Sequence, residues 1–249
     1  KNFIKNLVSG FLNVFALVAP KNRVAILMYH SVERNNIPST VSPENFAQQM
    51  AYLQKKQYQV ISLASLVDIL EKKQPLPAKA VVISFDDGYQ DNFIFAWPIL
   101  QKYNFPATIF LTNGTVGGEK IKKNGQRLKM LAWPEIAKMQ NSGLINFQPH
   151  TISHPRLSEI SPEQAQKEIS ESQAMIEARL AGEACFFAYP YGDYNQAVID
   201  ILRKNNFRAA LTVKQGLVSP QSPFFELPRL AISFKTSLRQ FKSKLNFGV

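Results

Sequence analysis

Cysteine is almost absent from this sequence, which has only Cys185 among its 249 residues. A single cysteine excludes an intrachain disulfide and leaves the redox compartment undetermined. Cys185 lies in the apolar run 185–188, which favours a small core residue. A catalytic thiol is disfavoured, because no base accompanies this cysteine in a known pattern.

Acidic residues are also few, with 18 against 29 lysines and arginines, so the formal charge is +11. A basic chain favours an anionic neighbour. No recognised nucleic-acid-binding motif accompanies the charge, and we therefore expect no specific nucleic-acid partner. The basic residues are scattered apart from local clusters at 120–129 and 239–244, so a solvated basic face is the first interpretation. Attraction to acidic envelope polymers or to a membrane surface is the second.

A convincing membrane span is lacking in residues 1–22, although Leu7–Val18 is apolar and follows two lysines. This run is too short and too interrupted to cross a bilayer. It resembles the core of a signal peptide, but Pro20 follows Ala19 directly and there is no clean cleavage site. A signal remnant, an interfacial anchor helix and a helix packed on the main domain remain open. We expect residues 23–249 to form that domain, located in the cell envelope or secreted, with the N-terminal segment as a candidate membrane attachment.

Tandem repeats and low-complexity tracts are lacking as well, and strands alternate with helices throughout. The apolar runs predict strands at 24–29, 58–61, 79–85, 107–111, 145–147, 185–189, 208–212 and 229–233. A helix over 92–103 should kink at Pro98, and residues 113–129 are predicted to be a polar, glycine-rich loop. This alternation predicts a single parallel, barrel-like α/β domain, whose active site should lie at the carboxyl ends of the strands.

Acids and histidines follow two of these strands. Asp86 and Asp87 close the apolar run 80–83, and adjacent carboxylates repel unless a cation or proton is near. His150 and His154, in H-x-x-x-H spacing, follow the strand at 145–147. Two histidines and one aspartate, with positions left for water, are a common catalytic set for a transition metal. The second aspartate is then free to act as a base, which predicts a metal-dependent hydrolase.

Three motifs carry a family resemblance: Ser84–Gly88, His150–His154 and Ala188–Gly192. In this order and spacing the chain resembles polysaccharide deacetylases of the NodB-homology type (carbohydrate esterase family 4) over about residues 23–230. The resemblance implies an irregular (β/α) barrel and a divalent ion, with zinc expected. It also implies roles for individual residues: Asp87, His150 and His154 as metal ligands, Asp86 as general base, and the Tyr191 N–H as a donor to the oxyanion.

The chain departs from that family at two places. Ala188 stands where the family commonly has an arginine that braces the base. Arg229 is a candidate substitute, and a surface arginine with a structural role is the alternative interpretation of Arg229. The family's late histidine, its general acid, is missing, because no histidine follows His154. His30 is then the candidate acid, and a lone core histidine is the alternative interpretation. We also expect Tyr189, Pro190 and Arg229 to contact substrate.

An early Tyr-His pair and Tyr-Pro-Tyr-Gly in the third motif resemble the branch that deacetylates poly-N-acetylglucosamine. The resemblance therefore implies hydrolysis of the N-acetyl groups of an acetylated polysaccharide made of N-acetylglucosamine. Peptidoglycan, a glycolipid and a non-sugar amide are alternative substrates. A degenerate enzyme that only binds carbohydrate is a further alternative, although such a protein would not need Asp86 as a base.

Overall fold

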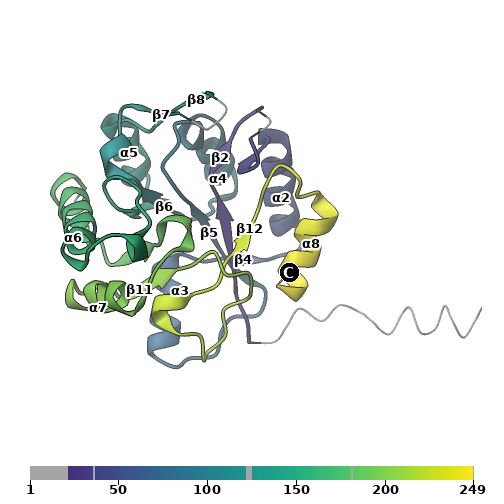
Figure 1. Ribbon diagram of the computed structural model, residues 1–249. Helices are drawn as coiled ribbons and strands as arrows, with labels where there is room; N and C mark the ends of the chain where they lie inside the picture. Colours follow the sequence, from purple (N-terminus) through teal and green to yellow (C-terminus); the bar gives the residue numbers. More distant parts are fainter. Residues whose placement is uncertain (1–21, 36, 122–124, 181, 249) are drawn as a thin grey trace, which may run out of the picture.

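A parallel sheet forms the centre of the computed structural model, which describes residues 22–35, 37–121, 125–180 and 182–248 (Figure 1). The strands lie in the order β12 (Leu230–Ala231), β1 (Ala25–Tyr29), β5 (Ala80–Phe85), β6 (Ala107–Leu111) and β9 (Ile145–Pro149). A further short strand, β4 (Gln59–Val60), pairs with the start of β5, while β6 pairs with its end. Every neighbour in this sheet is parallel, so all the strands present their carboxyl ends at the same edge.

The barrel is completed by a second parallel pair, β10 (Phe186–Ala188) and β11 (Ala209–Leu211). β9 meets β10 through a side chain: Gln148 accepts a hydrogen bond from Phe186 N (2.8 Å) and donates one to Glu183 O (3.1 Å). On the other side, Leu211 bridges to Leu227, three residues before β12. These irregular joints close the ring, as the predicted irregular barrel requires.

Helices cover the outside of this barrel (Figure 1). They are α2 (Pro43–Lys55), α3 (Leu63–Glu71), α4 (Trp97–Tyr103), α5 (Trp133–Asn141), α6 (Pro162–Arg179), α7 (Gln196–Lys204) and α8 (Leu238–Phe247). Serine or asparagine side chains cap the amino ends of α2, α3, α6, α7 and α8, as their positions in the sequence favour. Short single-turn helices lie at Asn113–Thr115, Leu157–Glu159, Pro190–Gly192 and Phe224–Glu226.

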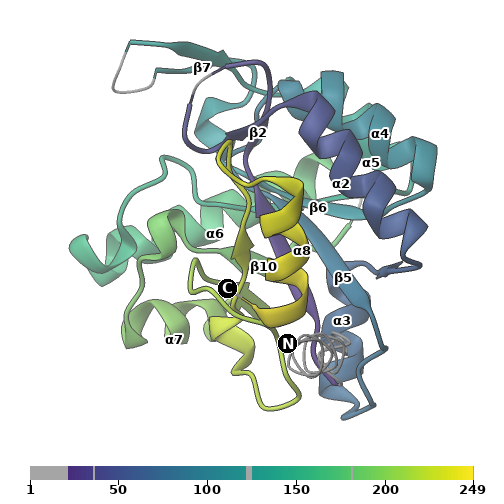
Figure 2. The ribbon, with the colours of Figure 1, turned by 90° about the vertical axis from the view of Figure 1, so that its right-hand side faces the viewer.

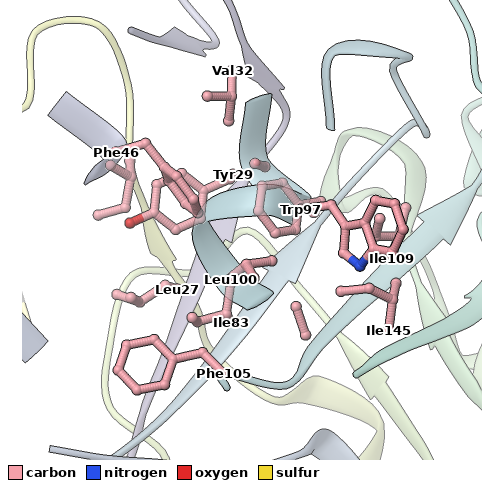
Figure 3. Packing of buried hydrophobic residues seen from close by; sticks show 14 of the residues in the cluster. Leu27, Tyr29, Val32, Phe46, Ile83, Trp97, Leu100, Phe105, Ile109 and Ile145 are labelled. Carbon is pink, nitrogen blue, oxygen red and sulfur yellow. The ribbon is translucent and has the colours of Figure 1, made fainter. Parts of the chain in front are cut away.

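Alternate residues of the central strands enter different parts of the core. Leu27, Tyr29 and Ile83 belong to the cluster under α2 and α4, where Tyr29 packs on Phe46 (Figure 3). Ile26 and Val82, which alternate with Leu27 and Ile83 along their strands, belong to a second cluster with α3 and β11. Since side chains alternate along a strand, Ser84 and Asp86 continue the series of Val82 and point into the barrel. The core therefore aims the acid at the interior of the ring.

One local expectation was wrong, and one predicted helix has a form that the sequence did not indicate. Residues 113–129 include an antiparallel hairpin, β7 (Glu119–Ile121) with β8 (Arg127–Lys129), which projects from the molecule in Figure 2. Its strands have exposed residues at both ends, so the alternation of apolar residues that predicts a strand is missing. The helix at 92–103 begins as a π-helix, Asn92–Ala96, and continues as α4. A π-turn before Pro98 fits the missing proline N–H, which cannot complete an α-helical hydrogen bond.

A further short parallel pair joins β2 (Ser31–Val32) to β3 (Thr40–Val41) after the end of β1. The predicted N-terminal segment, 1–22, lies outside the described residues except for Asn22. Within the part of the chain that is described, none of the helices has the length and apolarity needed to cross a membrane.

Candidate active site

A pocket of about 320 Å³ lies at the carboxyl ends of the strands. It gathers most of the residues that the motifs single out, although they come from distant parts of the chain. Its lining comprises His30, Ser39, Asp86, Asp87, Lys120, Ile121, His150, His154, Tyr189, Tyr191 and Val213. The barrel thus brings the carboxylate pair, the histidine pair and His30 into one pocket.

Asp87 and the two motif histidines form a set that could hold a metal ion. One ligand atom from each of Asp87, His150 and His154 lies within 4.8 Å of the others. Nε2 of His154 is 3.2 Å, and Nε2 of His150 is 3.9 Å, from Asp87 Oδ1. That oxygen is buried and accepts no well-formed hydrogen bond, while Oδ2 accepts one from the Tyr89 hydroxyl at 2.7 Å. An ionised carboxylate oxygen beside two imidazole nitrogens is a donor set that transition-metal cations favour, so the residues fit a bound cation.

His150 is oriented by its other ring nitrogen. Nδ1 lies 2.6 Å from the Ala188 carbonyl oxygen, which cannot donate, so Nδ1 carries the proton and Nε2 faces Asp87 with its lone pair. Burial lowers the pKa of His150 to about 4, although the nearby Asp86 and Asp87 charges oppose this. The imidazole is therefore neutral near pH 7, which is the form that ligates metals, and a hydrogen bond of this kind fixes ligating histidines.

Asp86 makes a buried ion pair with Arg229. The two carboxylate oxygens each lie 2.7 Å from a terminal guanidinium nitrogen, and Arg229 Nε donates to Thr212 O at 2.9 Å. Arg229 is fully buried. The sequence left a surface position or a brace for the base as alternatives, and the structure places Arg229 behind Asp86. It does not line the pocket, so the expected direct contact of Arg229 with substrate is not available in this structure.

The electrostatics of the two carboxylates follow from these neighbours. Burial raises the pKa of Asp86, but the charge and hydrogen bonds of Arg229 more than offset this and leave it below its usual value. Burial also opposes ionisation of Asp87, and here His154 and Lys120 hold the pKa well below its usual range. Both carboxyl groups are therefore ionised near neutral pH, each with its own cationic neighbour.

His30 lies at the pocket wall just after β1, and the segment that carries it is tied to the start of the π-helix. Asn92 donates to the His30 carbonyl oxygen at 2.8 Å. The Asp91 carboxylate accepts hydrogen bonds from Val32 N and from the Ser31 hydroxyl. Sequence reasoning overlooked Asp91 and Asn92, because their role depends on contacts about sixty residues away.

Of the three residues of the third motif that we expected at the site, one is exposed and two are buried. Tyr191 is 56% exposed, has a φ of 59°, and places its ring edge-on to His154 with centroids 4.5 Å apart. Tyr189 is buried, and its hydroxyl donates to Phe225 O at 2.9 Å. Pro190 is buried and is not part of the pocket lining. Of the three expected substrate contacts, only Tyr189 thus reaches the pocket wall.

Lys120, on β7, is a pocket residue that the sequence did not single out from its basic cluster. Its Nζ lies 2.9 Å from Asp87 Oδ1, and its side chain is 23% exposed. No local signal separates it from neighbouring lysines, because its position depends on the unpredicted hairpin. Lys120 thus places a third nitrogen group beside Asp87 Oδ1, in addition to His150 and His154.

The model of the family described as Polysaccharide deacetylase matches residues 73–210. The chain belongs to this family. The poly-β-1,6-N-acetyl-D-glucosamine N-deacetylase of Staphylococcus epidermidis is 27% identical over 233 residues, which cover 89% of this chain and 78% of that protein. These matches make the chain an enzyme of the polysaccharide N-deacetylase class.

Solved structures agree with this assignment. The Streptococcus pyogenes deacetylase PplD, in complex with acetate, superposes with a TM-score of 0.79 at 26% identity, covering 91% of this chain and 99% of that one. IcaB from Ammonifex degensii gives a TM-score of 0.78 at 25% identity, covering 90% and 97%. The predicted fold class, an irregular barrel in a single domain, is confirmed.

We predict that Arg229→Met destabilises the deacetylase by about 3–5 kcal/mol at pH 7, because it leaves the buried Asp86 carboxylate without its partner. The pair lowers the pKa of Asp86, so its stabilisation is present above the unfolded value of about 3.9 and is lost as pH falls through the folded value. In the variant the influence of Arg229 is gone, and burial, the largest influence, raises this pKa against the smaller effects of His150 and His30. Asp86 therefore binds a proton on mild acidification, and the loss of stability becomes smaller.

Urea unfolding of the wild-type protein and of Arg229→Met, at pH 7 and at pH 4.5, measures the difference between their free energies of unfolding. Arg239→Met, at an exposed position of α8, is the control and should change stability by less than about 0.5 kcal/mol. An equal deficit of Arg229→Met at both pH values would show that lost packing, rather than the Asp86 charge, causes the effect.

Proposed function

We propose that this deacetylase hydrolyses the acetamide groups of a linear N-acetylglucosamine polymer at the cell envelope, releasing acetate and leaving free amines. One observation carries the proposal: a single pocket holds the Arg229-paired Asp86, the Asp87–His150–His154 set and His30. A water-activating base, a metal set and a proton donor are the groups that amide hydrolysis requires.

The donor set of Asp87, His150 and His154 suits Zn²⁺, which favours imidazole nitrogen and carboxylate oxygen and leaves coordination positions open in catalytic sites. A zinc ion bound there would supply Lewis-acid chemistry and would lower the pKa of a water molecule from about 15.7 towards 7. His150 enters this set already neutral, and Asp87 already ionised, so neither ligand needs to lose a proton near pH 7.

Asp86 is assigned the role of general base. Its two oxygens are held by Arg229, which fixes the carboxylate plane, and each oxygen retains acceptor capacity towards the pocket. Asp86 would take the proton of the attacking water as the new carbon–oxygen bond forms. The Tyr191 N–H would donate to the oxygen of the acetyl carbonyl as negative charge develops there, a contribution of about 3 kcal/mol for such a donor.

His30 is assigned the role of general acid. An amide nitrogen leaves poorly unless it is protonated, so a proton donor on the leaving-group side is chemically required. Among the three histidines of the sequence, two belong to the proposed metal set, and His30 lines the same pocket. It would pass its proton to the departing amine and then recover one from solvent.

The substrate proposal rests on similarity and on the third motif. The S. epidermidis relative is named for poly-β-1,6-N-acetyl-D-glucosamine, so we propose a β-1,6-linked N-acetylglucosamine polymer as substrate. Peptidoglycan, a glycolipid or a non-sugar amide would use the same chemistry. The formal charge of +11 favours association with an anionic envelope or membrane surface. On this basis we propose that the protein is located in the cell envelope or secreted.

Metal-loaded enzyme should release acetate from β-1,6-linked N-acetylglucosamine oligomers at least about tenfold faster than from β-1,4-linked chito-oligomers, a preference equivalent to about 1.4 kcal/mol of transition-state binding. Acetate release can be followed on equal concentrations of both series and of solubilised peptidoglycan fragments. A preference for chito-oligomers or peptidoglycan would replace the proposed polymer. No turnover of any acetylated glycan would contradict a polysaccharide substrate and leave a non-sugar amide or carbohydrate binding alone as the alternatives.

Isosteric substitutions at the two adjacent positions should distinguish the roles of the two carboxylates. Asp87→Asn removes the charge from the metal set and should lose the ion, whereas Asp86→Asn should keep it and lose about 10²–10⁴-fold in turnover, because an amide cannot accept the water proton. Elemental analysis after dialysis, combined with acetate release, measures both effects. Wild-type metal content in Asp87→Asn would contradict the proposed metal set. Near-normal turnover of Asp86→Asn would contradict the base.

His30→Ala should retain its metal and lose most activity on acetamides. Its activity on an activated aryl acetate should fall far less, because an aryl oxide leaves without a proton. Rates on both substrates, measured with the same metal-loaded preparation, test this split. Equal losses on the two substrates would assign His30 a structural role, and unchanged acetamide turnover would eliminate it as the acid.

A further inference from the structure

The loop from His150 to His154 carries both motif histidines and has an unusual backbone. Thr151 and His154 have φ values of 66° and 62°, in the left-handed region that residues other than glycine rarely adopt. Such conformations persist only where the surrounding structure holds them. The loop therefore depends on contacts made by neighbouring segments.

One edge of the loop is held by the segment after β6. The Leu111 carbonyl accepts from His150 N, while Asn113 N and Gly114 N donate to the carbonyls of Thr151 and Ile152. A side chain at Gly114 would not fit, because its Cβ would lie 2.6 Å from Ile152 O. Backbone hydrogen bonds and the close approach at Gly114 therefore hold this edge of the loop.

The other edge is held by one side chain from α6, Glu168. Its Oε2 accepts hydrogen bonds from Ile152 N (2.8 Å) and Ser153 N (2.9 Å). Its Oε1 accepts one from the Ser153 hydroxyl (2.6 Å). One carboxylate therefore serves three donors between the two histidines, and bonds of this kind to an ionised acceptor are short and strong.

We propose that Glu168 is a positioning residue for the metal set, which holds His150 and His154 at the spacing that Asp87 requires. This inference rests on the proposed function, since it concerns how the same site binds its ion. Glu168 does not line the active-site pocket, so it acts through the loop rather than on the substrate. The geometry explains why the role falls on an acid: all three loop groups donate, and a carboxylate offers only acceptors.

α6 is suited to this role because it contacts both the His150–His154 loop and the segment after β6 that holds the other edge of this loop. Its start carries a capping box between Ser161 and Gln164. One turn after Glu168, the Ser172 carbonyl accepts from the Asn113 side chain at 3.0 Å. The same helix thus fixes the His150–His154 loop directly and fixes the opposing segment through Asn113.

The test measures metal affinity, with Zn²⁺ competing against a chromophoric chelator, and the absorption spectrum of the Co²⁺-loaded protein. Glu168→Ala should weaken affinity by about 10–100-fold, the range for residues that support metal ligands, and should alter the Co²⁺ spectrum. Glu168→Gln, whose amide oxygen can still accept from the two N–H groups, should lie between Glu168→Ala and wild type. Glu171→Ala is the matched control on the same helix, since Glu171 is exposed, forms an ion pair with Lys167 at 3.9 Å, and should match wild type.

Circular dichroism and a cooperative unfolding transition of each metal-free variant establish that it is folded. Should Glu168→Ala fail that check, Ser153→Ala, which removes only the hydroxyl bond, and Glu168→Gln carry the test. Wild-type affinity and an unchanged Co²⁺ spectrum in folded Glu168→Ala or Glu168→Gln would overturn the inference while the metal site itself stands. Absence of metal binding by the wild-type protein would overturn the proposed metal site, and the inference would fall with it.

Discussion

The arrangement of this active site depends on the burial of two adjacent carboxylates at the end of β5. Neighbouring charges in a poorly solvated site are stable only if each has its own compensation. Asp86 finds it in Arg229, at 2.7 Å through both oxygens, and Asp87 finds it in Lys120, His154 and any cation that the set holds. Because the strand turns at Asp87, with a φ of 73°, the two carboxylates face different partners and can take different roles.

Backbone strain gathers at the same rim. Asp87, Thr151, His154 and Tyr191 all have positive φ values between 59° and 73°, and each belongs to one of the three motifs. Left-handed conformations at residues with a Cβ cost free energy that the rest of the fold must offset. Here tertiary hydrogen bonds from the single-turn helix Asn113–Thr115 and from α6 hold the histidine loop in its conformation. The strained conformations thus lower the stability of the fold at the site, where they set the direction of a few side chains.

The sequence was sufficient for the features set by local pattern. Apolar runs located the strands, and the acids and histidines that follow them were correctly expected at one rim, because parallel strands share a carboxyl edge. The β7–β8 hairpin was missed, since its strands expose most of their residues and carry no apolar alternation. Lys120 was missed with it. The partner of Asp86 could be offered only as one alternative, because Arg229 is 143 residues away and meets Asp86 only after the barrel closes.

Ala188 and Arg229 together show how this chain supplies a positive charge to Asp86. The family resemblance implies an arginine at position 188, on β10, to brace Asp86, but the small Ala188 stands there. Arg229 reaches the same carboxylate from the residue before β12, with Nε anchored on Thr212 O. Ala188 keeps another task, since its carbonyl oxygen fixes the His150 ring, and a backbone oxygen can do so whatever the side chain. In this chain the positive charge that the buried Asp86 needs inside the barrel is therefore supplied by Arg229, from the residue before β12.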